Sequence, residues 1–259
     1  MKKTLLTLTL LASLSACNVI DSASINQQAA LSYRQAMTEA SQHKMVDTTS
    51  ATAKRVQRVF QRLVPYADAA NRTGQAFQWE MTVIRSDELN AWAMPGGKMA
   101  VYTGIVEKLK LTDDELAAII GHEMTHALLE HSKKEANRNV GLNIGAQLGT
   151  SILAATTGVD GNLIGLGMGL ATDLGVDKPF SRSAEREADM GGLYLMAQAG
   201  YNPEAAISVW QKMNQHDNNN HTINKILSTH PTNNDRMDLL RKELPKVMPV
   251  YRQALTRRG

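Results

Sequence analysis

A predicted helix with two histidines four residues apart constrains this chain more than any other feature of its sequence. The helix begins at a capping box, with Thr112 as the N-cap and Glu115 reaching back to it. Further along, the sequence reads His122-Glu123-Met-Thr-His126. Residues four apart share one helical face, with about 5–6 Å between their Cβ atoms, so His122 and His126 are placed to bind one tetrahedral zinc ion. Glu123 lies beside that face, where it can accept a proton from metal-bound water.

Such a zinc site needs a third protein ligand, and the residues that follow do not supply it in the metzincin manner. That motif requires Gly where this chain has Leu129, and His where it has Ser132. His131 lies one residue before the position at which the metzincin motif has its third histidine. We interpret it as a structural residue near the C-terminus of the helix, where the helix dipole favours it.

A better candidate for the third ligand lies in the segment from Ser181 to Asp189. Glu185 and Asp189 are four residues apart on a second predicted helix, which ends at Gly200. Glu185 can bind zinc, while Asp189 can accept the other N–H of a ligand histidine. Acids at this spacing more often form a solvated helix face, but the incomplete zinc site favours the functional interpretation. We expect Glu187 to point elsewhere.

His230 is a further candidate. It precedes a proline and a helix that Thr232 is expected to cap, with Arg236 on its first turns. A histidine in such a loop is usually a surface residue. If the zinc site activates water for attack on a carbonyl group, however, a donor is needed for the oxyanion of the transition state. Two hypotheses stay open: His230 donates to the oxyanion, or it fills the open zinc position in a resting state. We expect Arg236 to pair with Glu185 or Asp189.

The remaining pattern predicts an α+β fold that is predominantly α-helical, with a small antiparallel β-sheet. Apolar periodicity predicts a helix near 52–67, and the chain is again helical after Leu111. Three short strands are expected between them, with a Pro-Gly-Gly turn joining the second to the third. We expect the hairpin over 89–102 to bind an extended substrate along its sheet edge. The edge residues are Asn90, Ala91, Trp92 and Ala93.

The start of the chain resembles an export signal. Lys2 and Lys3 precede an apolar run over 5–14 that is too short to span a membrane. The only cysteine, Cys17, follows Leu-Ser-Ala, which resembles a lipoprotein cleavage site; the alternative is a plain signal peptide with an incidental cysteine. We therefore expect a signal peptide over 1–16, lipid on Cys17, and a tether with some helix over 17–50. The residue after the cysteine is not Asp, which favours the periplasmic side of a bacterial outer membrane.

One stretch is harder to interpret. Residues 140–159 carry no charge and contain glycines at G-x-x-x-G spacing, which permits a transmembrane helix. A single span would put Glu185 and His126 on opposite sides of the membrane, although both are expected to bind one metal ion. We therefore favour a packed helical hairpin at about 139–176 over a membrane-touching segment.

The charge balance gives no electrostatic case for nucleic acid as a partner. Without Lys2 and Lys3, the chain has 26 basic and 25 acidic residues, a net charge of +1.

Several segments together resemble one family of zinc peptidases. They read H-E-M-T-H, S-R-S-A-E-R-E-A-D, S-T-H-P-T-N-N-D-R and N-A-W-A-M-P-G-G. Over about residues 55–240 the chain is similar to the peptidases related to HtpX, Oma and the prenyl-protein endopeptidases, and most like the periplasmic lipoproteins of the LoiP and BepA type. It departs from the integral-membrane members by lacking their spanning helices, and from the BepA type by lacking tetratricopeptide repeats.

The resemblance implies a zincin-like (gluzincin) domain over 51–259 that holds one Zn²⁺ per chain. It implies His122, His126 and Glu185 as ligands and Glu123 as base, with a catalytic supporting role for Asp189. The expected function is zinc-dependent cleavage of unfolded or misassembled envelope proteins. The alternative is an envelope assembly factor or chaperone-like module whose zinc site is latent or structural. A structural site would have four protein ligands and no open position.

Overall fold

The computed structural model describes residues 20–143, 179–220, 225–231 and 234–257. The expected signal peptide, Cys17, the Thr232 cap and the expected hairpin from residue 144 onward lie outside the described residues. Within the described ranges, no helix is both long enough and apolar enough to cross a membrane.

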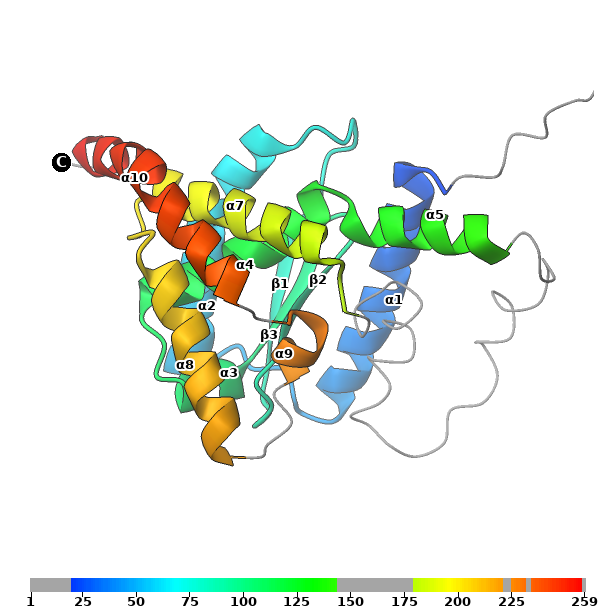
Figure 1. Ribbon diagram of the computed structural model, residues 1–259. Helices are drawn as coiled ribbons and strands as arrows, with labels where there is room; N and C mark the ends of the chain where they lie inside the picture. The colour runs from blue at the N-terminus through cyan, green and yellow to red at the C-terminus, as the bar shows by residue number, and fades with distance from the viewer. Residues whose placement is uncertain (1–19, 144–178, 221–224, 232–233, 258–259) are drawn as a thin grey trace, which may run out of the picture.

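The described helices surround a small sheet (Figure 1). They are α1 (Ser22–Gln42), α2 (Ala51–Ala70), α3 (Thr103–Lys108), α4 (Asp113–Leu128), α5 (His131–Asn143), α7 (Arg182–Gln198), α8 (Ala205–Asn220), α9 (Lys225–Thr229) and α10 (Asn234–Thr256). This confirms the predicted fold class and the helix near 52–67. The capping box is also confirmed, since the Thr112 hydroxyl accepts from the Glu115 N–H and the Glu115 carboxylate accepts from the Thr112 N–H.

The three strands are β1 (Glu80–Ile84), β2 (Ala91–Met94) and β3 (Lys98–Tyr102), in the order β1-β3-β2. β2 and β3 form the expected antiparallel hairpin, and both glycines of its turn, Gly96 and Gly97, have positive φ. β1, however, pairs in parallel with β3. The prediction of an antiparallel sheet was therefore wrong. The reason is that the chain passes from β1 to the far edge before the hairpin returns, so β3 lies between the other two strands.

The two faces of the sheet pack against different helices. Met99 and Val101 of β3 face the main core with α2 and α4, whereas Ala100 faces α1. Ile25 and Tyr33 of α1 are buried on that second face, and the Tyr33 hydroxyl donates to the Met99 carbonyl at 3.0 Å. The segment expected to be a tether therefore contributes a packed helix, because its apolar residues recur at helical spacing.

The crossing of α4 and α7 places the candidate functional residues together. At the crossing, Gly121 faces Gly192, and a Cβ on Gly192 would lie only 2.7 Å from the backbone nitrogen of His122. Glycine is required at this position because the two backbones approach so closely. As a result, Glu185 and Asp189 on the first turns of α7 lie against the histidines of α4.

Candidate active site

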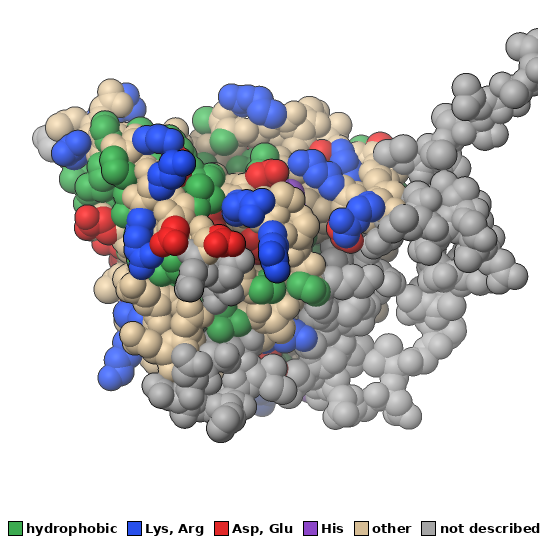
Figure 2. All heavy atoms as spheres, viewed as in Figure 1, with side chains coloured by type: hydrophobic (Ala, Val, Ile, Leu, Met, Phe, Trp, Pro, Cys, Tyr) green, Lys and Arg blue, Asp and Glu red, His purple; other side chains and the backbone are tan. Residues whose placement is uncertain are grey.

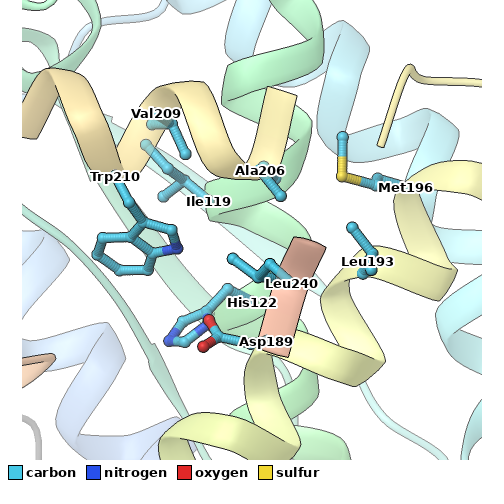
Figure 3. A pocket seen from close by; sticks show the side chains of 10 residues that line it. Ile119, His122, Asp189, Leu193, Met196, Ala206, Val209, Trp210 and Leu240 are labelled. Atoms are coloured by element: carbon cyan, nitrogen blue, oxygen red, sulfur yellow. The ribbon is translucent and has the colours of Figure 1, made fainter. Parts of the chain in front are cut away.

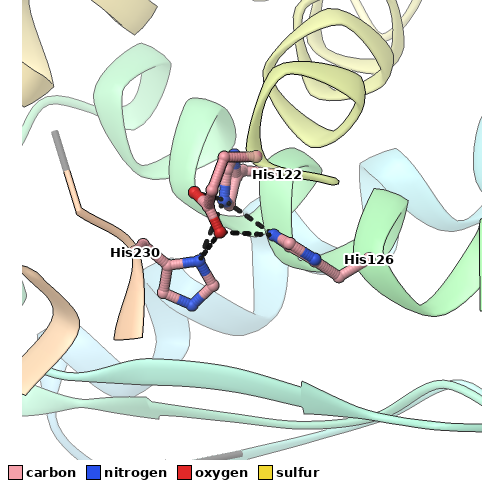
Figure 4. Close-up of side chains that lie close together, drawn as sticks. His122, His126 and His230 are labelled. Carbon is pink, nitrogen blue, oxygen red and sulfur yellow. Dashed lines mark hydrogen bonds and ion pairs between the residues drawn. The ribbon is translucent and has the colours of Figure 1, made fainter. Parts of the chain in front are cut away.

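Four buried side chains from three parts of the chain converge on one point (Figure 4). His122 and His126 come from α4, Glu185 comes from α7, and His230 follows α9. Each offers one ligand atom, and these four atoms lie within 4.8 Å of one another. None of the four residues is more than 4% exposed. The structure thus brings together the three ligands predicted from the sequence and adds His230 to them.

The spacing of these atoms fits a tetrahedral metal ion. Bonds of about 2.0–2.1 Å to a tetrahedral Zn²⁺ place the ligand atoms about 3.3 Å apart. The observed separations are 3.1 Å for His122 Nε2 to His126 Nε2, 3.2 Å for His122 Nε2 to His230 Nδ1, 3.0 Å for His230 Nδ1 to Glu185 Oε1, and 3.4 Å for His126 Nε2 to Glu185 Oε1. Nitrogen and carboxylate donors of this kind suit zinc, and the residues present therefore fit the ion that the sequence predicts.

His122 is held from behind by a buried ion pair. Its Nδ1 lies 3.1 Å from Asp189 Oδ1, and Arg236 donates two hydrogen bonds of 2.6 Å to the same carboxylate. Burial acts to lower the pKa of His122, but the hydrogen bonds to Asp189 and Glu185 outweigh it and raise that pKa to about 9. Apolar side chains of α4, α7, α8 and α10 line a small cavity beside this pair (Figure 3).

Arg236 links Glu185 and Asp189 of α7, as expected from the sequence. Its guanidinium lies 2.7 Å from Glu185 Oε2 and also over the ring of Trp210, which packs edge-on against the His122 ring. Burial acts to raise the pKa of Asp189, but the hydrogen bonds and charges of Arg236 and His122 together outweigh it and lower this pKa, so the carboxylate stays charged. Sequence reasoning missed Trp210, because nothing in its local pattern separates it from a core tryptophan.

His126 has a different set of supports. Its Nδ1 lies 2.9 Å from Nδ1 of His131, whose Nε2 lies 3.2 Å from Glu187 Oε2. Phe180 stacks on the His126 ring, with 4.1 Å between ring centroids. Burial, together with the nearby His122 and His230, lowers the pKa of His126 well below its usual value. The sequence analysis left His131 and Glu187 outside the site, whereas the structure places His131 beside the ligand His126, and Glu187 beside His131.

Glu123 lies next to the ligand group and is 2% exposed. Burial raises its pKa above the usual value, against the influence of His230, His122 and the Ala93 backbone. Its Oε1 accepts no hydrogen bond within the described part of the chain, although His230 Nε2 lies 3.4 Å away. A buried carboxylate oxygen without a donor is unusual, and it marks a position where a water or a substrate can bind.

Glu185 stays charged despite its burial. Burial acts to raise its pKa, but His230, His122 and His126 lower it to below the usual range.

The segment that carries His230 is held by backbone hydrogen bonds from Ile226 N–H to Leu89, next to β2, and from Phe180 N–H to Thr229. His230 is therefore a buried residue of the site, not a surface residue.

The strand expected to bind substrate, β2, lies at the edge of the sheet. β2 pairs with β3 on one side and is an edge strand among the described residues. Asn90 precedes the strand, and its carbonyl accepts from the N–H of Tyr102. The side chains of Trp92 and Ala93 are buried.

On the face seen in Figure 2, Lys and Arg side chains are interspersed with fewer Asp and Glu side chains.

The fold and the site define a mostly helical protein in which two histidines and a glutamate, with His230 as a fourth, lie beside Glu123, whose Oε1 accepts no hydrogen bond among the described residues. Two histidines and a glutamate beside a second glutamate are the groups that a zinc metallopeptidase uses. Residues 50–244 match the model of peptidase family M48, so the chain belongs to that family. It is 30% identical to the mitochondrial metalloendopeptidase OMA1 of Schizosaccharomyces pombe, over 83% of this chain and 59% of that protein. The metalloprotease LoiP of Escherichia coli is 28% identical, over 71% of this chain and 69% of LoiP.

The metalloprotease YcaL of Escherichia coli is 23% identical over 77% of this chain and 75% of YcaL. The matched region covers less of other relatives, including only 36% of OMA1 of Arabidopsis thaliana.

Proposed function

We propose that this chain is a zinc-dependent endopeptidase in which Glu123 activates the attacking water. The observation that carries the proposal is the position of the unsatisfied Glu123 carboxylate beside four atoms spaced as ligands of one metal ion. Membership of family M48 supports it.

His122, His126 and Glu185 would hold the ion. When bound, Zn²⁺ acts as a Lewis acid that makes a coordinated water acidic near neutral pH. Glu123 takes the proton of the attacking water at Oε1, the atom that no hydrogen bond holds. Asp189 accepts the Nδ1–H of His122 and so keeps its Nε2 directed at the metal position.

Digestion of casein by the purified chain tests the activity. We expect cleavage that a chelator abolishes and added zinc restores, together with about one zinc per chain by elemental analysis. Cleavage that survives complete removal of metal would contradict a zinc mechanism. Zinc without any cleavage would favour the second candidate function.

That second candidate is a latent or structural zinc site in an envelope assembly factor or chaperone-like protein. The specific observation that favours it is His230, whose Nδ1 completes a set of four protein ligands and leaves no open position. We reconcile both candidates by proposing that His230 occupies the fourth position in a resting state and must leave it before catalysis.

Substitution of His230 separates its two hypothetical roles. If His230 closes the site, His230→Ala increases casein cleavage or self-cleavage. If His230 donates to the oxyanion instead, the same change lowers kcat by about 10²–10³-fold with zinc retained. Unchanged activity would exclude both roles.

The edge strand β2 supports a proposal for the substrate class. An extended peptide that pairs with the backbone of β2 is selected by its main chain more than by its side chains, which favours unfolded or misassembled proteins.

The apolar N-terminal run and Cys17 favour a lipid-anchored protein of the bacterial envelope on the periplasmic side, at the outer membrane. Cys17→Ser should abolish lipid labelling and release the protein from membranes. A variant that stays bound after a high-salt wash would require a second anchor.

A further inference from the structure

The two histidines of α4 are supported by different partners, and one of these supports has no role in the mechanism above. His131 is the first residue of α5 and is 4% exposed, yet it is not one of the four ligand residues. Glu130, between the end of α4 and His131, has φ +52°, so the chain turns there before α5 begins. This turn directs the His131 ring at His126, with 4.8 Å between the ring centroids.

If both rings are neutral, the contacts of His131 allow only one placement of the protons on His126 and His131. Nε2 of His126 faces the ligand group, so it must carry no proton when it binds a metal. The proton then lies on Nδ1 and is donated to Nδ1 of His131, 2.9 Å away. His131 in turn carries its own proton on Nε2 and donates it to Glu187 Oε2, 3.2 Å away.

We propose that His131 is a positioning residue that fixes the tautomer and ring orientation of His126, and that Glu187 does the same for His131. This inference rests on the proposed role of His126 as a metal ligand. It assigns to His126 the kind of support that Asp189 gives to His122, but supplied by a neutral imidazole in place of a carboxylate.

The surroundings of this support differ from those of the Asp189 support. Glu187 is 52% exposed and, with His131 and Phe180, lines a surface groove between α5 and α7. Asp189 and Arg236 are 1% and 4% exposed. The His126 side of the metal site therefore reaches solvent through His131 and Glu187, whereas the partners of His122 are almost completely buried among the described residues.

Two amide substitutions at His131 provide a matched test, because each replaces one ring nitrogen. The Asn side chain places its oxygen where Nδ1 lies and can still accept from His126. The Gln side chain places its polar atoms near Nε2 and leaves His126 without an acceptor. We expect the zinc dissociation constant, measured against a competing chelator, to rise about 10–100-fold in His131→Gln and His131→Leu. In His131→Asn it should stay within about threefold of the parent value.

The tautomer of His126 is a second readout, which a purely structural role would not change. In two-bond ¹H–¹⁵N spectra of the zinc-free protein, we expect the Nδ1–H form of His126 to become mixed in His131→Gln and to persist in His131→Asn. Equal zinc affinity in all three variants, or equal weakening by Asn and Gln, would overturn the proposal. Should His131→Leu fail to fold, the two amide variants still decide the question.

Glu185→Ala, measured in the same assay, keeps this test separate from the proposed function. If it binds zinc as the parent does, the metal site itself is wrongly assigned. If it loses zinc while His131→Gln does not, only the positioning role fails. Glu135→Gln, on the same helix and the same groove, serves as the control for a change of surface charge.

Discussion

Helix α4 buries a glutamate near each end, and the two carboxylates differ in how they are satisfied. Glu115 and Glu123 are 3% and 2% exposed. Glu115 accepts hydrogen bonds from the Thr112 N–H, the Ser208 hydroxyl and the Lys212 ammonium. Glu123 has an oxygen that accepts none within the described residues.

The pKa values of these two residues move in opposite directions for this reason. Burial acts to raise both pKa values. At Glu115, Lys212 and the hydrogen bonds of the capping box outweigh burial and lower the pKa. At Glu123, burial dominates and the pKa is raised. Burial alone therefore does not mark a functional carboxylate. At Glu123 the functional interpretation rests on the missing donor together with the adjacent group of metal-ligand atoms.

The largest expected effect is a loss of catalytic activity, which distinguishes Glu123 from Glu115. Glu123→Gln should lower casein cleavage by about 10²–10⁴-fold, because the amide cannot accept the proton of the attacking water. Zinc content and thermal unfolding should stay close to those of the parent. Glu115→Gln is the matched control, since it makes the same change on the same helix and should leave kcat unchanged. Activity that survives in Glu123→Gln would remove this residue from the role of base.

The second prediction concerns Glu185, the metal ligand that α7 places beside Glu123 and the histidines of α4. Glu185→Ala should weaken zinc binding by about 100-fold or more, since a ligand contributes more than its outer-sphere supports. Glu187→Ala should weaken it far less, because the half-exposed Glu187 contacts only His131 among the metal-site histidines. Elemental analysis after dialysis measures both. Equal loss of zinc from the two variants would mean that the wrong acid is assigned as the ligand.

The sequence alone was sufficient for the parts of the structure that local patterns determine. The capping box at Thr112 and the paired histidines lie on one helix, so spacing alone places them. Glu185 was predicted because two histidines do not complete a zinc site and a third protein ligand was needed. The glycines at the crossing of α4 and α7 could not be interpreted without the structure, because their role depends on which helix lies opposite.

The remaining features depend on tertiary contacts or on a break in the helix. His131 is five residues after His126, and the left-handed Glu130 between them makes helical spacing inapplicable. The donors Ser208 and Lys212 approach Glu115 from α8, about 90 residues further along the chain. The parallel pairing of β1 with β3 depends on where the chain crosses the sheet, which no strand pattern specifies.

The third prediction concerns the structural end of α4. Glu115→Gln should lower the free energy of unfolding by about 1 kcal/mol, because it removes a charged partner from Lys212 and weakens the capping box. Urea unfolding of the zinc-free protein measures this change without any contribution from metal binding. Thr112→Ala removes the other half of the capping box and should cost about the same. Unchanged stability in both variants would show that the packing of α4 makes its cap redundant.

The smallest expected effect is the pH dependence of the difference in unfolding free energy between the parent and Glu115→Gln. A carboxylate whose pKa is lowered on folding stabilises the folded state above its unfolded pKa, and this stabilisation is lost as the pH falls through the folded value. For Glu115, whose pKa is lowered from 4.5, the difference in unfolding free energy between the parent and Glu115→Gln should be full near neutral pH. It should shrink as the pH falls from about 5 towards 3, as Glu115 becomes protonated and loses its attraction for Lys212. Urea unfolding of both zinc-free proteins across this range measures the difference. A constant difference at all pH values would mean that the effect of Glu115 comes from its shape and hydrogen bonds and not from its charge.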